Sequence, residues 1–197
     1  MAKYVYLMRH AEQTMNNIDD IWQIEAPLVQ TANNRIRDVA QYFSQQGICF
    51  SSFWHSSLVR SQQTCRILRD FMNSNARTRL NRKLGPGEVA VWNTRYVSWK
   101  QNQTDPTNPP IIGSIEIARL WPDLSEREGQ RVTTALNEIL QEINDHECAV
   151  AISHNPLIRL AEGLIQGHID GPDPDYCQAI LVVLNGYKLE TQVLLQI

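Results

Sequence analysis

Two histidines follow short apolar runs, and one residue separates each histidine from its run. Arg9 and His10 follow the run VYLM at residues 5–8, and His154 follows the run at residues 148–152. Runs of this length predict buried strands, and the carboxyl ends of strands are where open α/β sheets bind ligands. If the two strands are parallel neighbours, both imidazoles lie at the same edge of the sheet.

Positive charge is expected beside these histidines. Arg60 lies in the first turn of a helix predicted over 58–72, and Pro156 begins a helix predicted over 156–166. The N-terminus of a helix favours an anion, and guanidinium groups pair with phosphate oxygens. We therefore expect the two arginines, the two histidines and the helix N-termini to form a site for a phosphoryl group.

The composition excludes several classes of protein. With 197 residues, of which 43% are hydrophobic, the chain can bury one sizeable core, and we predict a single domain over residues 1–197. The net charge of -3 gives no general attraction to nucleic acid or to an anionic membrane. There is no signal-peptide pattern and no run of about 18 apolar residues. We expect a soluble, cytoplasmic protein, and the oligomeric state stays open.

The cysteines do not indicate a metal site or a disulfide framework. They are scattered along the chain and lack CxxC spacing. The four are Cys49, Cys65, Cys148 and Cys177. We expect buried free thiols in a reducing compartment.

Strand-like and helix-like segments alternate along the chain. The predicted strands are 4–8, 48–54, 78–84, 148–152, 179–184 and 189–195, and the predicted helices are 33–46, 58–72, 126–144 and 156–166. This order predicts an α/β three-layer sandwich, in which a mixed, mainly parallel sheet is flanked by helices. Between about 85 and 110, the density of Pro, Gly, Asn and Thr predicts an irregular, lid-like excursion. A hairpin is expected around Asn185 and Gly186.

Four stretches share the order and spacing of one family's motifs. Residues 7–12 read LMRHAE, and Asn16 follows them at the position of a motif asparagine. Residues 56–64 read SSLVRSQQT, and residues 153–159 read SHNPLIR. These stretches resemble the RHG, RHGETxxN, SSPLxRAxQT and SHGGxIR patterns of the histidine phosphatase superfamily, the phosphoglycerate-mutase-like proteins. The resemblance spans nearly the whole chain.

The resemblance implies a phosphatase mechanism. His10 would attack phosphorus and form a phosphohistidine that water later hydrolyses. The residues expected to hold the phosphoryl oxygens are Arg9, Asn16, Arg60, His154 and Asn155. The family's chemistry requires no metal, and no other cofactor is implied. The expected substrate is a phosphorylated small molecule or a phosphoprotein.

A carboxylic acid is needed to protonate the leaving oxygen. Glu88 follows the third predicted strand, at about the place where many members of the family carry their proton donor. Glu12 and Glu116 are the alternatives. The sequence therefore predicts Glu88 as the acid without excluding the other two.

The chain also departs from the family's pattern. Ala11 replaces the signature glycine, and residues 155–156 replace a glycine pair. The chain lacks the long insertions of a sugar-phosphate mutase, and its compact layout is similar to the small SixA-like phosphohistidine phosphatases of branch 1. In the excursion, Trp92, Tyr96 and Trp99 either cover the core or form an aromatic wall over the substrate.

Other interpretations remain open at this stage. The chain could be a phosphomutase acting on a small phosphorylated metabolite, or a non-catalytic phosphate-binding module. Individual residues also have structural alternatives: His10 as a capped strand end, Arg60 as a helix-surface residue and Asn16 as a turn former. The remaining polar residues are interpreted as surface or supporting residues: His55, His146, His168 and Arg159.

Overall fold

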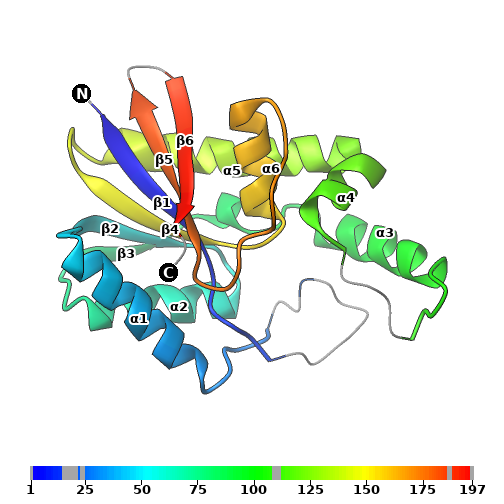
Figure 1. The fold of residues 1–197 in the computed structure, drawn as a ribbon, viewed down its shortest axis with the longest axis horizontal. Coiled ribbons are helices and arrows are strands. Elements are labelled where there is room, and N and C mark those ends of the chain that lie inside the picture. Colours follow the sequence, from blue (N-terminus) through cyan, green and yellow to red (C-terminus); the bar gives the residue numbers. More distant parts are fainter. Residues whose placement is uncertain (1, 15–21, 23–24, 108–111, 186–187, 196–197) are drawn as a thin grey trace.

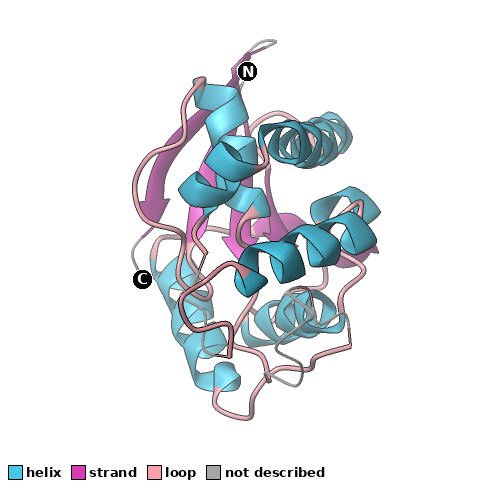
Figure 2. Ribbon diagram, turned by 90° about the vertical axis from the view of Figure 1, so that its right-hand side faces the viewer, coloured by secondary structure: helices cyan, strands magenta, loops and turns pink. Residues whose placement is uncertain are grey.

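The computed structural model describes residues 2–14, 22, 25–107, 112–185 and 188–195. They form one sheet with helices on both of its faces (Figure 1). Figure 2 views the same arrangement from the side on which the third and fourth helices lie.

The sheet contains six strands. They are β1 (Lys3–Arg9), β2 (Phe50–His55), β3 (Arg77–Leu80), β4 (Cys148–Ser153), β5 (Ala179–Asn185) and β6 (Lys188–Leu195). Their order is β3-β2-β4-β1-β5-β6, in which the first four are mutually parallel and β5 and β6 pair antiparallel. The predicted mixed, mainly parallel sheet is confirmed, and so is the pairing of the last two strands. Part of the expected hairpin turn lies outside the described residues.

Helices cover both faces of the sheet because its central strand is apolar on both sides. The flanking helices are α1 (Ala32–Gln45), α2 (Val59–Phe71), α5 (Pro122–Glu142) and α6 (Leu157–Gln166). In β1, Val5 and Leu7 join a buried cluster with α5 and α6, whereas Met8 joins one with α1 and α2. Successive side chains of a strand point to opposite faces, so this strand requires a helical layer on each. The three-layer sandwich is therefore confirmed.

The segment predicted to be irregular contains a helix. α3 (Val89–Gln101) occupies most of it, so the prediction of irregular structure is wrong there. Pro86 and Gly87 precede the helix, and a polar segment with Thr and Pro follows it, which made the whole stretch resemble a loop. Apolar residues recur at helical spacing along α3, at Val89, Trp92, Tyr96 and Trp99, but Trp92 alone of its 13 residues is buried. Whether the segment acts as a lid stays a prediction.

Two further differences concern short elements. The predicted strand over 78–84 ends at Leu80 and is followed by a turn of 3-10 helix, η1 (Arg82–Leu84). α4 (Ser114–Leu120) was not predicted, and α5 begins at Pro122, earlier than expected. Pro122 suits the first turn of a helix because it has no N–H to leave unpaired. α4 and α5 together bring the chain back from α3 to the sheet.

The described residues contain no helix that combines the length and the apolar character needed to cross a membrane. The four cysteines are free thiols, as expected. Cys65 and Cys177 are buried, whereas Cys49 is exposed, so the expectation of burial holds for only part of the set.

Candidate active site

Parallel pairing of β1 with β4 brings the two predicted histidines together. Arg9 is the register partner of Ser153, and the backbone N–H of His10 donates to the backbone carbonyl of Ser153 at 3.1 Å. The ring centroids of His10 and His154 are 4.9 Å apart. His10 is 5% exposed and His154 is fully buried. The register of the sheet thus places both imidazoles at the carboxyl ends of neighbouring strands, as predicted.

The hydrogen bonds of His10 determine which ring nitrogen has a free electron pair. Nδ1 lies 2.7 Å from the carbonyl oxygen of Ala11, and Nε2 lies 3.1 Å from Nε of Arg60. A carbonyl oxygen only accepts and a guanidinium only donates, so Nδ1 carries the proton and Nε2 the lone pair. Burial, with Arg60 and Arg9 nearby, holds the pKa of His10 well below its ordinary value. His10 is therefore a neutral imidazole whose Nε2 is nucleophilic.

Arg60 is fixed beside this nitrogen by the start of α2. It lies in the first turn and is 2% exposed. Thr64, one turn further on, donates from Oγ1 to the carbonyl of Arg60 and accepts from the backbone N–H of Ala11, at 2.8 and 3.0 Å. This single hydroxyl joins the turn that carries His10 to the helix that carries Arg60. The expectation that Arg60 lies beside the histidines is met, and the helix-surface alternative is excluded by its burial.

Arg9 is held on the other side of the site by the segment before β5. Its Nη1 donates to the carbonyl of Pro174 at 2.8 Å, and its guanidinium carbon lies 4.0 Å from the ring centroid of Tyr176. The Tyr176 ring is also 5.8 Å from the His10 ring. Cation–π contact of this kind favours one orientation of the guanidinium. Tyr176 was not singled out from the sequence as a site residue, because no motif surrounds it.

Two buried nitrogens at the site have no hydrogen-bond partner in the described part of the chain. They are Nε of Arg9 and Nδ1 of His154. A buried nitrogen left unpaired costs roughly 1–3 kcal/mol, so such groups usually have a partner. An anion between the two residues would provide one. These nitrogens, with Arg60, make the neighbourhood of His10 Nε2 suited to the oxygens of a phosphoryl group.

Asn155 faces a different part of the molecule. Its Oδ1 accepts a hydrogen bond from Oγ of Ser114 at 3.0 Å, at the start of α4. The Ser114 backbone N–H in turn donates to the carboxylate of Asp173 at 3.1 Å. In this structure the Asn155 side chain thus ties α6 to α4, and its contact with phosphate stays a prediction. Asn16 lies outside the described residues, so its predicted role stays a prediction too.

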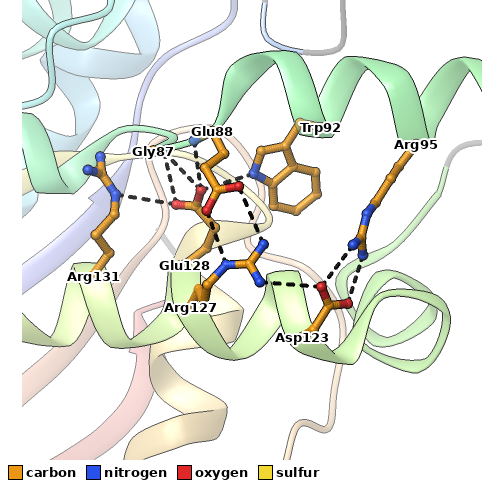
Figure 3. Close-up of polar contacts among 8 residues, drawn as sticks. All are labelled: Gly87, Glu88, Trp92, Arg95, Asp123, Arg127, Glu128 and Arg131. Atoms are coloured by element: carbon orange, nitrogen blue, oxygen red, sulfur yellow. Dashed lines mark hydrogen bonds and ion pairs between the residues drawn. The ribbon is translucent and has the colours of Figure 1, made fainter.

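The Glu88 carboxylate is directed toward α5 (Figure 3). Its Oε1 lies 3.1 Å from Nε of Arg127, and both side chains are close to half exposed. Arg127 also contacts Asp123, which is paired with Arg95 of α3. No contact within the described residues joins the Glu88 carboxylate to His10, so the structure does not bring the predicted acid into contact with the predicted nucleophile.

The backbone around Glu88 is fixed by a second carboxylate, that of Glu128 on α5 (Figure 3). Its oxygens accept from the backbone N–H of Gly87 at 2.9 and 3.0 Å and from that of Glu88 at 3.1 Å. It also accepts from the indole of Trp92 at 3.3 Å and pairs with Arg131 at 3.4 Å. Glu128 is 1% exposed. This buried carboxylate caps the N-terminus of α3 and was not identified from the sequence.

The two alternative acids lie in different surroundings. Glu12 is exposed just after the strand end. Glu116 lies in the first turn of α4, 4.0 Å from Arg119. Neither has a contact with His10 among the residues described, so the choice of Glu88 stays a prediction.

The aromatic residues of the excursion divide into two groups. Trp92 is buried, and its ring centroid lies 5.4 Å from that of Trp22, which is 6.0 Å from the ring of His154. Tyr96 and Trp99 stack on each other at 5.8 Å. Trp92 is therefore a core residue behind His154, and an aromatic wall over the substrate stays a prediction for the other two.

The remaining predicted surface residues are partly corrected. Arg159 is 7% exposed, pairs with Glu162 and donates to the carbonyl of Pro172, so it is a buried supporting residue of α6 and not a surface residue. It connects α6 with the segment that leads to Tyr176. His55 is 8% exposed and its Nδ1 lies 2.7 Å from the carbonyl of Ser56. It is a buried strand-end residue.

The fold and this site define a class of protein. The model of the histidine phosphatase superfamily, branch 1, matches residues 5–173, and the chain belongs to this family. A search of curated protein sequences gave no match.

Several solved structures have the same fold. The chain is similar to phosphoglycerate mutase from Bacillus anthracis, with a TM-score of 0.72 and 15% identity, over 97% of this chain and 92% of that one. It is similar to the protein histidine phosphatase SixA complexed with tungstate, with a TM-score of 0.59 and 16% identity over 98% and 96%. It is also similar to the mycobacterial glucosyl-3-phosphoglycerate phosphatase, with a TM-score of 0.62 and 13% identity, over 98% of this chain and 98% of that one. Identities this low establish the shared fold alone.

Proposed function

We propose that the protein is a phosphatase that hydrolyses phosphomonoesters or phosphohistidine through a phosphohistidine on His10. The observation that carries the proposal is the state of His10: a neutral imidazole whose Nε2 lone pair lies beside Arg60. Two buried nitrogens that have no partner among the described residues, Nε of Arg9 and Nδ1 of His154, lie on neighbouring elements. A nucleophile surrounded by donors is the arrangement that phosphoryl transfer requires.

The reaction has two displacements. First, the Nε2 lone pair of His10 forms a bond to phosphorus while the bond to the leaving oxygen breaks, and that oxygen takes a proton from the carboxylic acid of Glu88. Water then attacks the phosphorus of the phosphohistidine and gives a proton to the Glu88 carboxylate. The N–P bond breaks, which releases inorganic phosphate and restores the lone pair on His10.

In this mechanism the donors do most of the work. Arg9, Arg60 and His154 hold the non-bridging oxygens and balance the charge that spreads over them in the transition state. Their burial strengthens these interactions, because the surroundings screen charge less than water does. Glu88 can protonate the leaving oxygen only if its side chain moves away from Arg127. We propose that this movement occurs when the substrate binds.

The proposed substrate is a phosphorylated small molecule or a phosphoprotein. The similarity to the Bacillus anthracis mutase, at a TM-score of 0.72, makes phosphomutase activity the second candidate. A mutase must return the phosphoryl group from the enzyme to product, whereas a hydrolase transfers it to water. Incubation with a bisphosphorylated primer and analysis of the products separates the two: released inorganic phosphate supports the phosphatase, and an isomerised monophosphate supports the mutase.

The test of the proposal is His10→Ala. We expect this variant to lose turnover of a panel of phosphorylated metabolites, phosphopeptides and phosphohistidine protein, and to lose the acid-labile phosphoenzyme seen on rapid quenching. His168→Ala is the matched control, since His168 is exposed and pairs only loosely with Asp170, at 3.3 Å. Undiminished turnover in His10→Ala would overturn the mechanism. Absence of turnover in the unaltered protein over the whole panel would favour the phosphate-binding module.

A further inference from the structure

The second histidine has a hydroxyl partner that the proposed mechanism has not used. Oγ of Ser56 lies 2.6 Å from Nε2 of His154, and both residues are fully buried. Ser56 belongs to the turn between β2 and α2, whereas His154 follows β4. The contact therefore depends on the pairing of β2 with β4.

The position of Ser56 is fixed from several sides. Its backbone N–H lies 3.0 Å from Oγ of Ser61, which itself donates to the carbonyl of Ile152 at 2.8 Å. Gly85 packs so closely that a Cβ there would lie 3.2 Å from Cβ of Ser56. The hydroxyl thus has little freedom to leave His154.

The hydrogen bonds around Ser56 indicate where its proton lies. Oγ accepts from the backbone N–H of Leu58 at 3.2 Å. A hydroxyl has one proton to donate, and the nearby acceptor for it among the described residues is Nε2 of His154. If Nε2 instead donated to Oγ, the hydroxyl proton would be buried without an acceptor, at a cost of roughly 1–3 kcal/mol. The balance favours donation by Ser56.

The consequence concerns the other nitrogen of the His154 ring. When Nε2 accepts from Ser56, a neutral imidazole carries its proton on Nδ1. Nδ1 of His154 is the buried atom that has no partner among the described residues. Burial, with His10, Arg60 and Arg9 facing the ring, holds the pKa of His154 well below its ordinary value and keeps the ring neutral.

We propose that Ser56 is a positioning residue that holds His154 in the tautomer protonated on Nδ1, so that this nitrogen donates to a phosphoryl oxygen of the substrate. The inference rests on the proposed function and adds to it how one of the donors is prepared. His10 and His154 then carry their protons on the same ring nitrogen and perform opposite roles. His10 offers the lone pair on Nε2, and His154 offers the N–H on Nδ1.

Nitrogen-15 NMR of the ring nitrogens in Ser56→Ala tests the inference directly. In the unaltered protein, at about pH 8 where histidine is neutral, we expect Nδ1 of His154 to be protonated and Nε2 to be unprotonated. In Ser56→Ala we expect the proton to move wholly or partly to Nε2. A purely structural role of Ser56 would not change this signature. A protonated Nε2 in the unaltered protein, or an unchanged tautomer in the variant, would overturn the inference.

Binding of inorganic phosphate measures the functional effect. We expect Ser56→Ala to weaken phosphate binding by roughly tenfold, the order expected for one buried hydrogen bond to an anion. Ser153→Ala is the matched control: Ser153 is equally buried and adjacent to His154, but its hydroxyl donates to the carbonyl of Leu84 at 2.7 Å. It should retain the affinity and the tautomer. Equal losses in the two variants would indicate a general packing defect and contradict the inference.

The two proposals can fail separately. Failure of the proposed function would be seen in the His10→Ala phosphoenzyme assay. Failure of the inference would be seen in the ring nitrogens of His154, which are measured without substrate. If His154 shows the expected tautomer but the protein has no phosphatase activity, the proposed function fails. The inference then holds for a site that binds phosphate without hydrolysing its esters.

Discussion

Arg9 owes its position to a side chain far away in the sequence. Its guanidinium lies over the ring of Tyr176 at 4.0 Å and donates to the carbonyl of Pro174. The sequence placed Arg9 at a strand end correctly, because a single apolar run is enough to predict the end of a strand. It could not identify Tyr176, since the contact depends on how the segment before β5 returns to the site.

Removal of the Tyr176 ring tests this support. We expect Tyr176→Ala to lower kcat/KM by about twofold to tenfold, because an exposed or half-buried cation–π contact contributes roughly 0.5–2 kcal/mol. Tyr176→Phe keeps the ring and serves as the control, so it should retain most of the activity. Steady-state kinetics on the best substrate of the panel gives the measurement. Equal losses in both variants would assign the effect to the hydroxyl and contradict the role of the ring.

At the scale of elements, α3 depends on polar contacts with α5 more than on an apolar stripe. Of its 13 residues only Trp92 is buried, and its N-terminus is capped by the buried carboxylate of Glu128. Gly87 is suited to this close approach, since a Cβ there would lie 2.9 Å from the side chain of Arg131. The Pro, Gly, Asn and Thr residues of this part of the chain suggested a loop, and the contacts with α5 are distant in sequence, so the helix was missed.

Loss of the Glu128 carboxylate should destabilise the fold and loosen the start of α3. Glu128→Ala leaves the backbone N–H groups of Gly87 and Glu88 without their acceptor, and we expect the free energy of unfolding to fall by about 1–3 kcal/mol. Glu126→Ala is the control, because Glu126 is exposed on the same helix. Equilibrium unfolding in urea measures both. If Glu128→Ala and Glu126→Ala lower the free energy of unfolding by the same amount, the hydrogen bonds from the start of α3 to Glu128 add no stability of their own.

At the scale of the whole molecule, the two site histidines, His10 and His154, are buried and neutral at one edge of the sheet. Burial is the main cause that lowers the pKa of both His10 and His154, and the positive charge of Arg60 adds to it. The unfolded chain has no such burial, so the same histidines take up protons there at their ordinary pKa of about 6.5. Folding is therefore linked to pH through this site.

The sign of this linkage gives a prediction. At about pH 8, well above the unfolded pKa of about 6.5, neither state binds these protons and the free energy of unfolding has its full value. As the pH falls below 6.5, the unfolded state binds protons that the folded state does not bind. The free energy of unfolding therefore decreases until the pH reaches the folded pKa values. Below about pH 6, and above the folded pKa values, we expect a slope approaching two protons, about 2.7 kcal/mol per pH unit.

Urea unfolding across this pH range measures the slope, and His154→Gln should reduce it by about one proton. His55, whose pKa burial also lowers, adds a smaller contribution that the variant leaves unchanged. A slope that is the same in the unaltered protein and in His154→Gln would contradict the assignment of the linkage to this site.

The sequence by itself determined the class of fold and four of the residues that the fold brings together in the site. Arg9, His10, Arg60 and His154 follow local signals, namely the end of an apolar run or the first turn of a helix, and local signals can be read along the chain. The tertiary structure alone decided the supporting contacts: Thr64 on Ala11, Ser56 on His154, Tyr176 on Arg9 and Glu128 on the start of α3. The residues in each of these pairs are distant in sequence, and the register of parallel strands and the packing of helices bring them together. Hydrogen-bond partners and burial set the protonation of a histidine, so the nucleophilic nitrogen of His10 became known only once the fold had placed Ala11 and Arg60 around it.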